Sequence, residues 1–161
     1  MIMVNGKQQG FTLLEMLLVF AIMGSLTLGG LGAFFSYQQN QSFRTSVSDV
    51  THLLRVAKSR ALSHTKPEQC RTEPLHGYQV ILNRGTSSYR LEAKCGNTFY
   101  PIIRQVLAKD VTFAPGSGGS SSRAFFAVST GIVPEPTTIT ITGFGKTNVI
   151  TIDVTGNISV E

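Results

Sequence analysis

The sequence is short of charged residues, cysteines and histidines, and each shortage excludes a class of protein. Only 14% of its 161 residues are charged, against roughly 25% in an ordinary soluble domain, so a freely soluble cytosolic domain is not expected. Two cysteines are too few for a disulfide-dense mini-protein, and 42% hydrophobic residues exclude a disordered chain. With 3 histidines and 9 carboxylates scattered along the chain, we expect no metal, no cofactor, no small-molecule substrate and no enzyme activity.

The charge deficit is concentrated near the N-terminus. Residues 16–35 form an uncharged run of 20 residues, which as a helix would span ~30 Å, the hydrocarbon thickness of a bilayer. The ordinary alternative is a cleaved secretory signal peptide. Three details count against it: the run is long, Gly10 separates it from the preceding cation Lys7, and no A-x-A-like cleavage site follows. The sequence therefore predicts a single transmembrane helix.

One carboxylate, Glu15, interrupts the apolar segment near its start. A charge near the centre of a bilayer costs roughly 2.5 kcal/mol or more, and less near the interface. A carboxylate kept at such a place usually has a partner. The alternative is an interfacial Glu that only marks the start of the helix.

The residues GFTLLE at positions 10–15, preceded by a short basic leader and followed by the uncharged run, resemble the class III signal of type IV pilins and pseudopilins. The resemblance implies that a prepilin peptidase cleaves between Gly10 and Phe11 and N-methylates Phe11. It also implies that the new amine pairs with Glu15 of a neighbouring subunit. The implied location is the inner membrane, with one span, a periplasmic or extracellular head, and other pilins as filament partners.

Beyond the apolar run, the hydrophobic period is first helical and then alternating. From Ser36 to about Ser63, apolar residues recur at spacings of three and four on one helix face, and Lys66-Pro67 then stops the helix. The apolar residues are Phe43, Val47, Val50, Leu54, Ala57 and Ala61. After Pro67 a period of two predicts strands, a hairpin turn at 83–85 and a flexible loop at 116–122. The expected strands are 76–82, 88–94, 99–107, 111–114, 124–128, 137–143, 147–155 and 158–160.

The predicted fold class is α+β, with a long N-terminal hydrophobic helix packed against a C-terminal antiparallel β-rich head. The expected parts are a leader peptide (1–10), a transmembrane and filament-core helix (11–35), an amphipathic helix of the head (36–66) and a β-rich globular head (67–161). The order of helix, hairpin, glycine-rich loop and strands resembles the GspH/FimT-like group. The lack of a proline before Pro67 also favours a minor pilin or pseudopilin, because major pilins often have one in the stem.

This resemblance implies a structural subunit of a type II secretion pseudopilus or a type IV pilus, between which the sequence does not choose. The head contains Cys70 and Cys95, and an oxidising environment outside the cytoplasm would allow them to form a disulfide. The alternative is a pair of reduced, buried thiols. A zinc site is not expected, because no second Cys or His pair has ligand spacing.

An alternative function of a different class is a DNA-binding, FimT-like minor pilin for DNA uptake in natural transformation. The basic residues considered for DNA contact are Arg104, Lys109, Arg123 and Lys146. Ordinary solvated charge is the favoured interpretation, because the sequence offers no aromatic stacking platform and no compact basic run. A membrane-anchored enzyme is a third alternative, for which the sequence shows no catalytic constellation.

Overall fold

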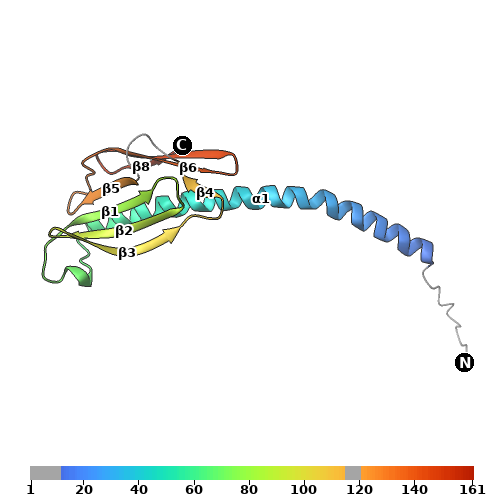
Figure 1. The fold of residues 1–161 in the computed structure, drawn as a ribbon, viewed down its shortest axis with the longest axis horizontal. Helices are drawn as coiled ribbons and strands as arrows, with labels where there is room; N and C mark the ends of the chain where they lie inside the picture. The colour runs from blue at the N-terminus through green and yellow to red at the C-terminus, as the bar shows by residue number, and fades with distance from the viewer. Residues whose placement is uncertain (1–11, 115–120) are drawn as a thin grey trace, which may run out of the picture. The chain divides into compact units, whose positions relative to one another are not determined.

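The structure is a computed structural model that describes residues 12–114 and 121–161, without the side chains of residues 26–30. In these ranges a long helix, α1 (Leu13–Leu62), is followed by a short 3-10 helix, η1 (Glu68–Cys70), and by eight strands. The contacts divide the chain into two units between Gln39 and Asn40, and α1 contributes to both. The long helix and the antiparallel strands confirm the α+β fold class (Figure 1).

The strands form two antiparallel sheets. The first sheet has the order β3-β2-β1-β5 and the second has the order β4-β6-β7-β8. The bounds are β1 Leu75–Asn83, β2 Ser88–Cys95, β3 Thr98–Val106, β4 Val111–Phe113, β5 Ser121–Ala127, β6 Thr137–Gly143, β7 Lys146–Ile152 and β8 Ile158–Val160. Each strand expected from the alternating pattern is present, although several ends differ.

The core of the second unit is one cluster in which a stripe of α1 meets both sheets. All six apolar residues of the predicted stripe are buried, which confirms that face of the helix. The cluster also contains inward side chains of the first sheet, such as Tyr78, Val80, Leu91 and Phe126, and of the second, such as Phe113, Ile139, Ile141 and Ile150. Within this unit the end of α1 lies along strands β1, β2 and β3 (Figure 1).

The turn between β1 and β2 joins the two sheets. The N–H of Gly85 donates to the carbonyl of Phe113 on β4 at 2.9 Å, and the N–H of Phe113 donates to the carbonyl of Thr86 at 2.9 Å. The rings of Tyr89 and Phe113 meet edge to face at 5.8 Å between centroids. Burial, reinforced by the nearby Asp49, raises the pKa of Tyr89 to about 12, so its hydroxyl is neutral at physiological pH.

Helix α1 ends at Leu62, before the break predicted at residues 66–67. The N–H of Thr65 donates to the carbonyl of Arg60 at 3.2 Å, and His64 has a φ of 53°. This is a Schellman motif, in which a residue in the left-handed conformation reverses the chain and satisfies the last carbonyls. The helix is therefore terminated by its own last turn and not by the proline.

Two sequence predictions are wrong in detail. The flexible loop predicted at 116–122 does not include its last two residues, because Ser121 and Ser122 begin β5 and Ser122 is buried. Residues 116–120 of that prediction lie outside the described residues. The strand predicted at 147–155 ends at Ile152, because a turn begins at Asp153 and leaves Val154 51% exposed.

Asp153 organises this turn between β7 and β8. Its Oδ1 accepts hydrogen bonds from Thr155 Oγ1 at 2.6 Å and from the N–H of Asn157 at 2.8 Å. The Thr155 bond first, and then the backbone bond from Asn157, hold the pKa of Asp153 below its ordinary value of 3.8. Gly156 follows with a φ of 71°, and a Cβ there would collide with the carbonyl of Gly131. The turn brings β8 back to pair with β7.

Asp153→Ala is expected to lower the free energy of unfolding at pH 7, because both hydrogen bonds to the carboxylate are lost. The folded pKa lies below the unfolded value of 3.8, so the ionised carboxylate contributes stability above that pH. This contribution is lost as the pH falls through the folded pKa. Urea unfolding should therefore show a higher free energy of unfolding for the wild type than for the variant at pH 7 and pH 5. This difference in free energy should close below pH 3.8.

The control for this experiment is Glu135→Ala, which removes an exposed carboxylate elsewhere in the same unit. It should show no comparable dependence on pH. A difference between wild type and Asp153→Ala that stays constant from pH 7 to pH 3 would contradict the assigned role of the carboxylate.

Candidate functional site

The predicted processing and assembly residues lie at the start of α1. Gly10 and Phe11 lie outside the described residues, but Thr12 and Glu15 are described. Thr12 Oγ1 accepts a hydrogen bond from the N–H of Glu15 at 3.3 Å, and the carbonyl of Thr12 accepts one from Met16 at 3.2 Å. Thr12 is therefore the N-cap and Glu15 is the third helical residue, the T-x-x-E arrangement of a capping box.

This cap explains why a carboxylate is tolerated at Glu15. The exposed N–H groups of a helix start carry a partial positive charge, which favours an anion in the first turn. The side chain of Glu15 is exposed. The structure therefore supports the interpretation of Glu15 as a residue at the helix start, and it leaves the carboxylate accessible to another molecule.

The helix that follows exposes apolar side chains at successive positions. Successive residues of a helix point about 100° apart, so this exposed surface surrounds the helix. The exposed large side chains here are Leu13, Leu14, Met16, Leu17, Leu18, Val19, Phe20, Ile22, Met23, Leu31, Phe34, Phe35 and Tyr37. Apolar surface of this extent indicates a region that other molecules cover.

Within the described residues, none of the helices combines the length and the apolar character that a membrane crossing requires.

The two cysteines are joined in the structure. Cys70 ends η1 and Cys95 ends β2, both are fully buried, and their Cα atoms are 5.4 Å apart. The hydroxyl of Tyr78 on β1 also donates to the carbonyl of Thr65, in the connection after α1. The disulfide thus fastens the connection after α1 to the first sheet. In residues 12–114 and 121–161, neither cysteine belongs to a group of His, Cys, Asp or Glu that could hold a metal ion.

The four basic residues considered for DNA contact do not come together on one sheet. Arg104 lies on β3 and Arg123 on β5, the two outer strands of the first sheet. Lys109 follows β3, and Lys146 begins β7 of the second sheet. Strand register therefore relates only Arg104 to Arg123.

One row across the first sheet contains three arginines. Arg90 on β2 pairs with Arg104 on one side and with Ile81 on the other, and Ile81 pairs with Arg123. Paired residues of antiparallel strands point to the same face, and successive residues of a strand point to opposite faces. Leu91, next to Arg90, belongs to the core, so these arginines lie on the opposite face. We call the face formed by Arg90, Lys94, Arg104 and Arg123 the arginine face.

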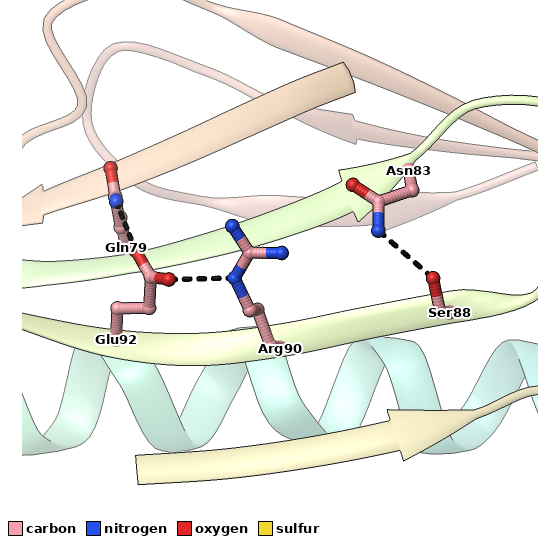
Figure 2. Close-up of polar contacts among 5 residues, drawn as sticks. All are labelled: Gln79, Asn83, Ser88, Arg90 and Glu92. Atoms are coloured by element: carbon pink, nitrogen blue, oxygen red, sulfur yellow. Dashed lines mark hydrogen bonds and ion pairs between the residues drawn. The ribbon is translucent and has the colours of Figure 1, made fainter. Parts of the chain in front are cut away.

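A buried carboxylate holds Arg90 on this face. Nε of Arg90 donates to Oε1 of Glu92 at 2.6 Å, and Nε2 of Gln79 donates to Oε2 of Glu92 at 2.6 Å (Figure 2). Glu92 is only 7% exposed. A buried charge is costly without a partner, and the guanidinium group of Arg90 is the partner of this carboxylate. Figure 2 shows the terminal nitrogens of Arg90 pointing away from Glu92. These nitrogens remain available on the outer side of the sheet.

Aromatic side chains also lie on the arginine face, around a lysine that was not among the four basic residues considered for DNA contact. Lys94 Nζ lies 5.7 Å from the ring centroid of Phe99 and 5.9 Å from that of Phe125. Both distances are within the range of a cation–π interaction. The two rings therefore contact Lys94 and do not form a free stacking platform. The strand register, which places Lys94 beside Phe99, is the signal that could have revealed them.

The comparison with known families concerns the N-terminal segment. Residues 5–31 match the family model of the prokaryotic N-terminal methylation motif. This is a type IV pilin-like prepilin signal, and the match confirms the resemblance to the type IV pilin and pseudopilin superfamily. The motif indicates a pilin-like or pseudopilin substrate of a prepilin peptidase that assembles with other pilins. No curated protein and no solved structure matches the chain.

Loss of the disulfide is expected to destabilise the second unit. The bond joins residues separated by 25 positions, for which the chain-entropy relation gives about 3.5 kcal/mol. The freshly isolated protein should gain two mass units on reduction and unfold at lower urea concentration afterwards. In the double variant Cys70→Ser/Cys95→Ser, reductant should have no effect on the unfolding midpoint. Free thiols in freshly isolated protein, or an unchanged midpoint after reduction, would contradict the expected role.

Proposed function

We propose that the protein is a minor pilin or pseudopilin, a structural and assembly subunit of a type II secretion pseudopilus or a type IV pilus, and not an enzyme. The observation that carries this proposal is the match of residues 5–31 to the methylation motif. The exposed apolar helix that follows supports it. A GspH/FimT-like head is the preferred subgroup, because the long helix, the hairpin and the later strands occur in that order.

In this proposal, a prepilin peptidase cleaves between Gly10 and Phe11 and N-methylates Phe11. The mature chain then starts one residue before the N-cap, Thr12. Residues 11–35 hold the precursor in the inner membrane, with the head on the periplasmic or extracellular side, and later form the core of the filament. The uncharged run at residues 16–35 supports this location.

Glu15 has the assembly role in this proposal. Cleavage creates a positively charged amine at Phe11, and the exposed carboxylate of Glu15 on a neighbouring subunit pairs with it. Two charges buried together in an apolar helix bundle are far better than either one left alone. The capping box supports this role, because Thr12 binds the backbone N–H of Glu15 while the carboxylate stays exposed.

A second candidate function is DNA binding during uptake, and the row of Arg90, Arg104 and Arg123 is the observation that favours it. Two observations weigh against it. Glu92 lies on the same face, and Lys109 and Lys146 lie outside the row. We therefore expect only weak, salt-sensitive affinity for DNA, in the non-specific range of about 10⁻⁴–10⁻⁶ M at physiological salt.

The processing site is tested by co-expression with a prepilin peptidase and intact-mass measurement. The wild-type chain should lose residues 1–10 and gain one methyl group. Gly10→Val should remain uncleaved, because a β-branched side chain crowds the backbone at the cut. The matched control is Gly6→Val, a glycine in the same leader, which should be cleaved like the wild type. Cleavage at another position, or normal cleavage of Gly10→Val, would contradict the proposal.

Glu15→Gln separates the capping role from the pairing role of this side chain. Glutamine is compatible with a capping box, so the helix start and peptidase cleavage should be retained. An unpaired buried amine costs several kcal/mol, so the amount of variant in sheared filaments should fall about tenfold or more. Quantitative immunoblotting of filament and membrane fractions measures this. Equal incorporation of the variant and the wild type would show that Glu15 serves the helix start alone.

A further inference from the structure

We propose that the arginine face of the first sheet is a docking site for an acidic, extended segment of a partner protein. The proposal goes beyond the pilin assignment, because it concerns recognition by the second unit. It rests on strand register, ion pairing and exposure, and the processing experiment above does not bear on it.

The first observation is a like-charge pair of which the described residues neutralise only one member. Arg90 and Arg104 pair directly across β2 and β3, where Cβ atoms are about 4.5–5.5 Å apart and like charges are destabilising. Glu92 forms an ion pair with Arg90. Arg104 is exposed and has no ion pair among residues 12–114 and 121–161. An external anion between the two guanidinium groups would remove the repulsion.

The second observation is the groove in which this pair lies. It has a volume of about 680 Å³ and is lined by residues that include Ser88, Arg90, Glu92, Pro101, Arg104 and Val106. Val106 is 71% exposed, so an apolar surface lies beside the arginines. Arginine next to exposed apolar side chains is typical of protein interfaces. A guanidinium group whose geometry is already fixed, as Glu92 fixes that of Arg90, suits two-point recognition of a carboxylate.

The third observation concerns the direction of the bound segment. β3 is an outer strand, but its edge contains Pro101, and its pairing with β2 shifts between Leu91 and Glu92. A proline and a bulge are features that prevent a further strand from pairing at a sheet edge. The segment therefore crosses the strands and does not extend the sheet. From β3 to β5 the row spans about 14 Å, which is the length of four or five extended residues.

The chemistry of the face favours an acidic peptide over a nucleic acid. Phe99 and Phe125, the aromatic rings on this face, are already in contact with Lys94. Sequence-tolerant binding of single strands needs free rings for base stacking and a continuous cationic track. Separate carboxylates spaced along a peptide meet the separate arginines better.

The test uses the full-length protein in a nonionic detergent and fluorescein-labelled peptides, TETETE and its uncharged match TQTQTQ. Fluorescence anisotropy should show that the wild type binds TETETE more tightly than TQTQTQ. Arg104→Gln should weaken the binding of TETETE by about fivefold or more. The control Lys146→Gln removes a cation from the second sheet and should bind TETETE like the wild type.

The melting temperature separates a docking role from a structural one. Because Arg104→Gln removes a like-charge contact, the melting temperature of the variant should stay the same or rise while its affinity falls. A fall in both would make Arg104 a structural residue and overturn the proposal. Equal binding of both peptides, or no binding of either, would overturn it as well.

Two further probes identify other occupants. An unlabelled dT12 oligonucleotide that binds more tightly than TETETE, and loses its affinity in Arg104→Gln, would overturn the proposal in favour of nucleic acid. Inorganic phosphate that displaces TETETE at the same concentration as unlabelled peptide would show that the groove binds anions in general, and would also overturn the proposal. The proposal predicts that the oligonucleotide binds more weakly than the peptide and that phosphate displaces the peptide only at much higher concentration.

Discussion

The second unit depends on the burial of one stripe of helix α1. Val50, Leu54, Ala57 and Ala61 are fully buried, and side chains from both sheets close around them in a single cluster. A twisted antiparallel sheet with one apolar face is not stable alone and needs a second layer. Here one helix supplies that layer for both sheets. Two further contacts stabilise this packing of both sheets on the stripe. They are the disulfide between Cys70 and Cys95 and the hydrogen bonds of the β1–β2 turn with Phe113.

The same helix has a different character toward its N-terminus. The Thr12 cap begins it, and the apolar side chains that follow are exposed on successive positions. Together with the methylation motif, these exposed side chains indicate that the first unit packs against other molecules. The second unit, in contrast, buries its own core. The arginine face adds a third surface, in which charge is left uncompensated beside exposed apolar side chains.

The parts of the fold that depend on local periodicity could be predicted from the sequence. The stripe from Phe43 to Ala61 follows the helical period, and the strands follow the period of two. The same helical pattern placed the end of the helix at about Ser63, one residue from the observed Leu62, but the left-handed conformation of His64 that ends it was not predicted. The prepilin signal was visible because it is contiguous. The arginine face was not visible in the sequence, because its residues come from separate strands and only the strand register brings them together. Arg90 was not among the residues predicted to contact DNA.

The most direct test of this account compares two leucines of the same helix. Leu54 is fully buried, whereas Leu62 is 45% exposed. Urea unfolding of the full-length protein in nonionic detergent should show that Leu54→Ala lowers the free energy of unfolding by about 2–5 kcal/mol, the usual cost of a cavity in a core. Leu62→Ala should cost less than about 1 kcal/mol. Equal losses for the two variants would show that the stripe does not hold the sheets together, and would contradict the account.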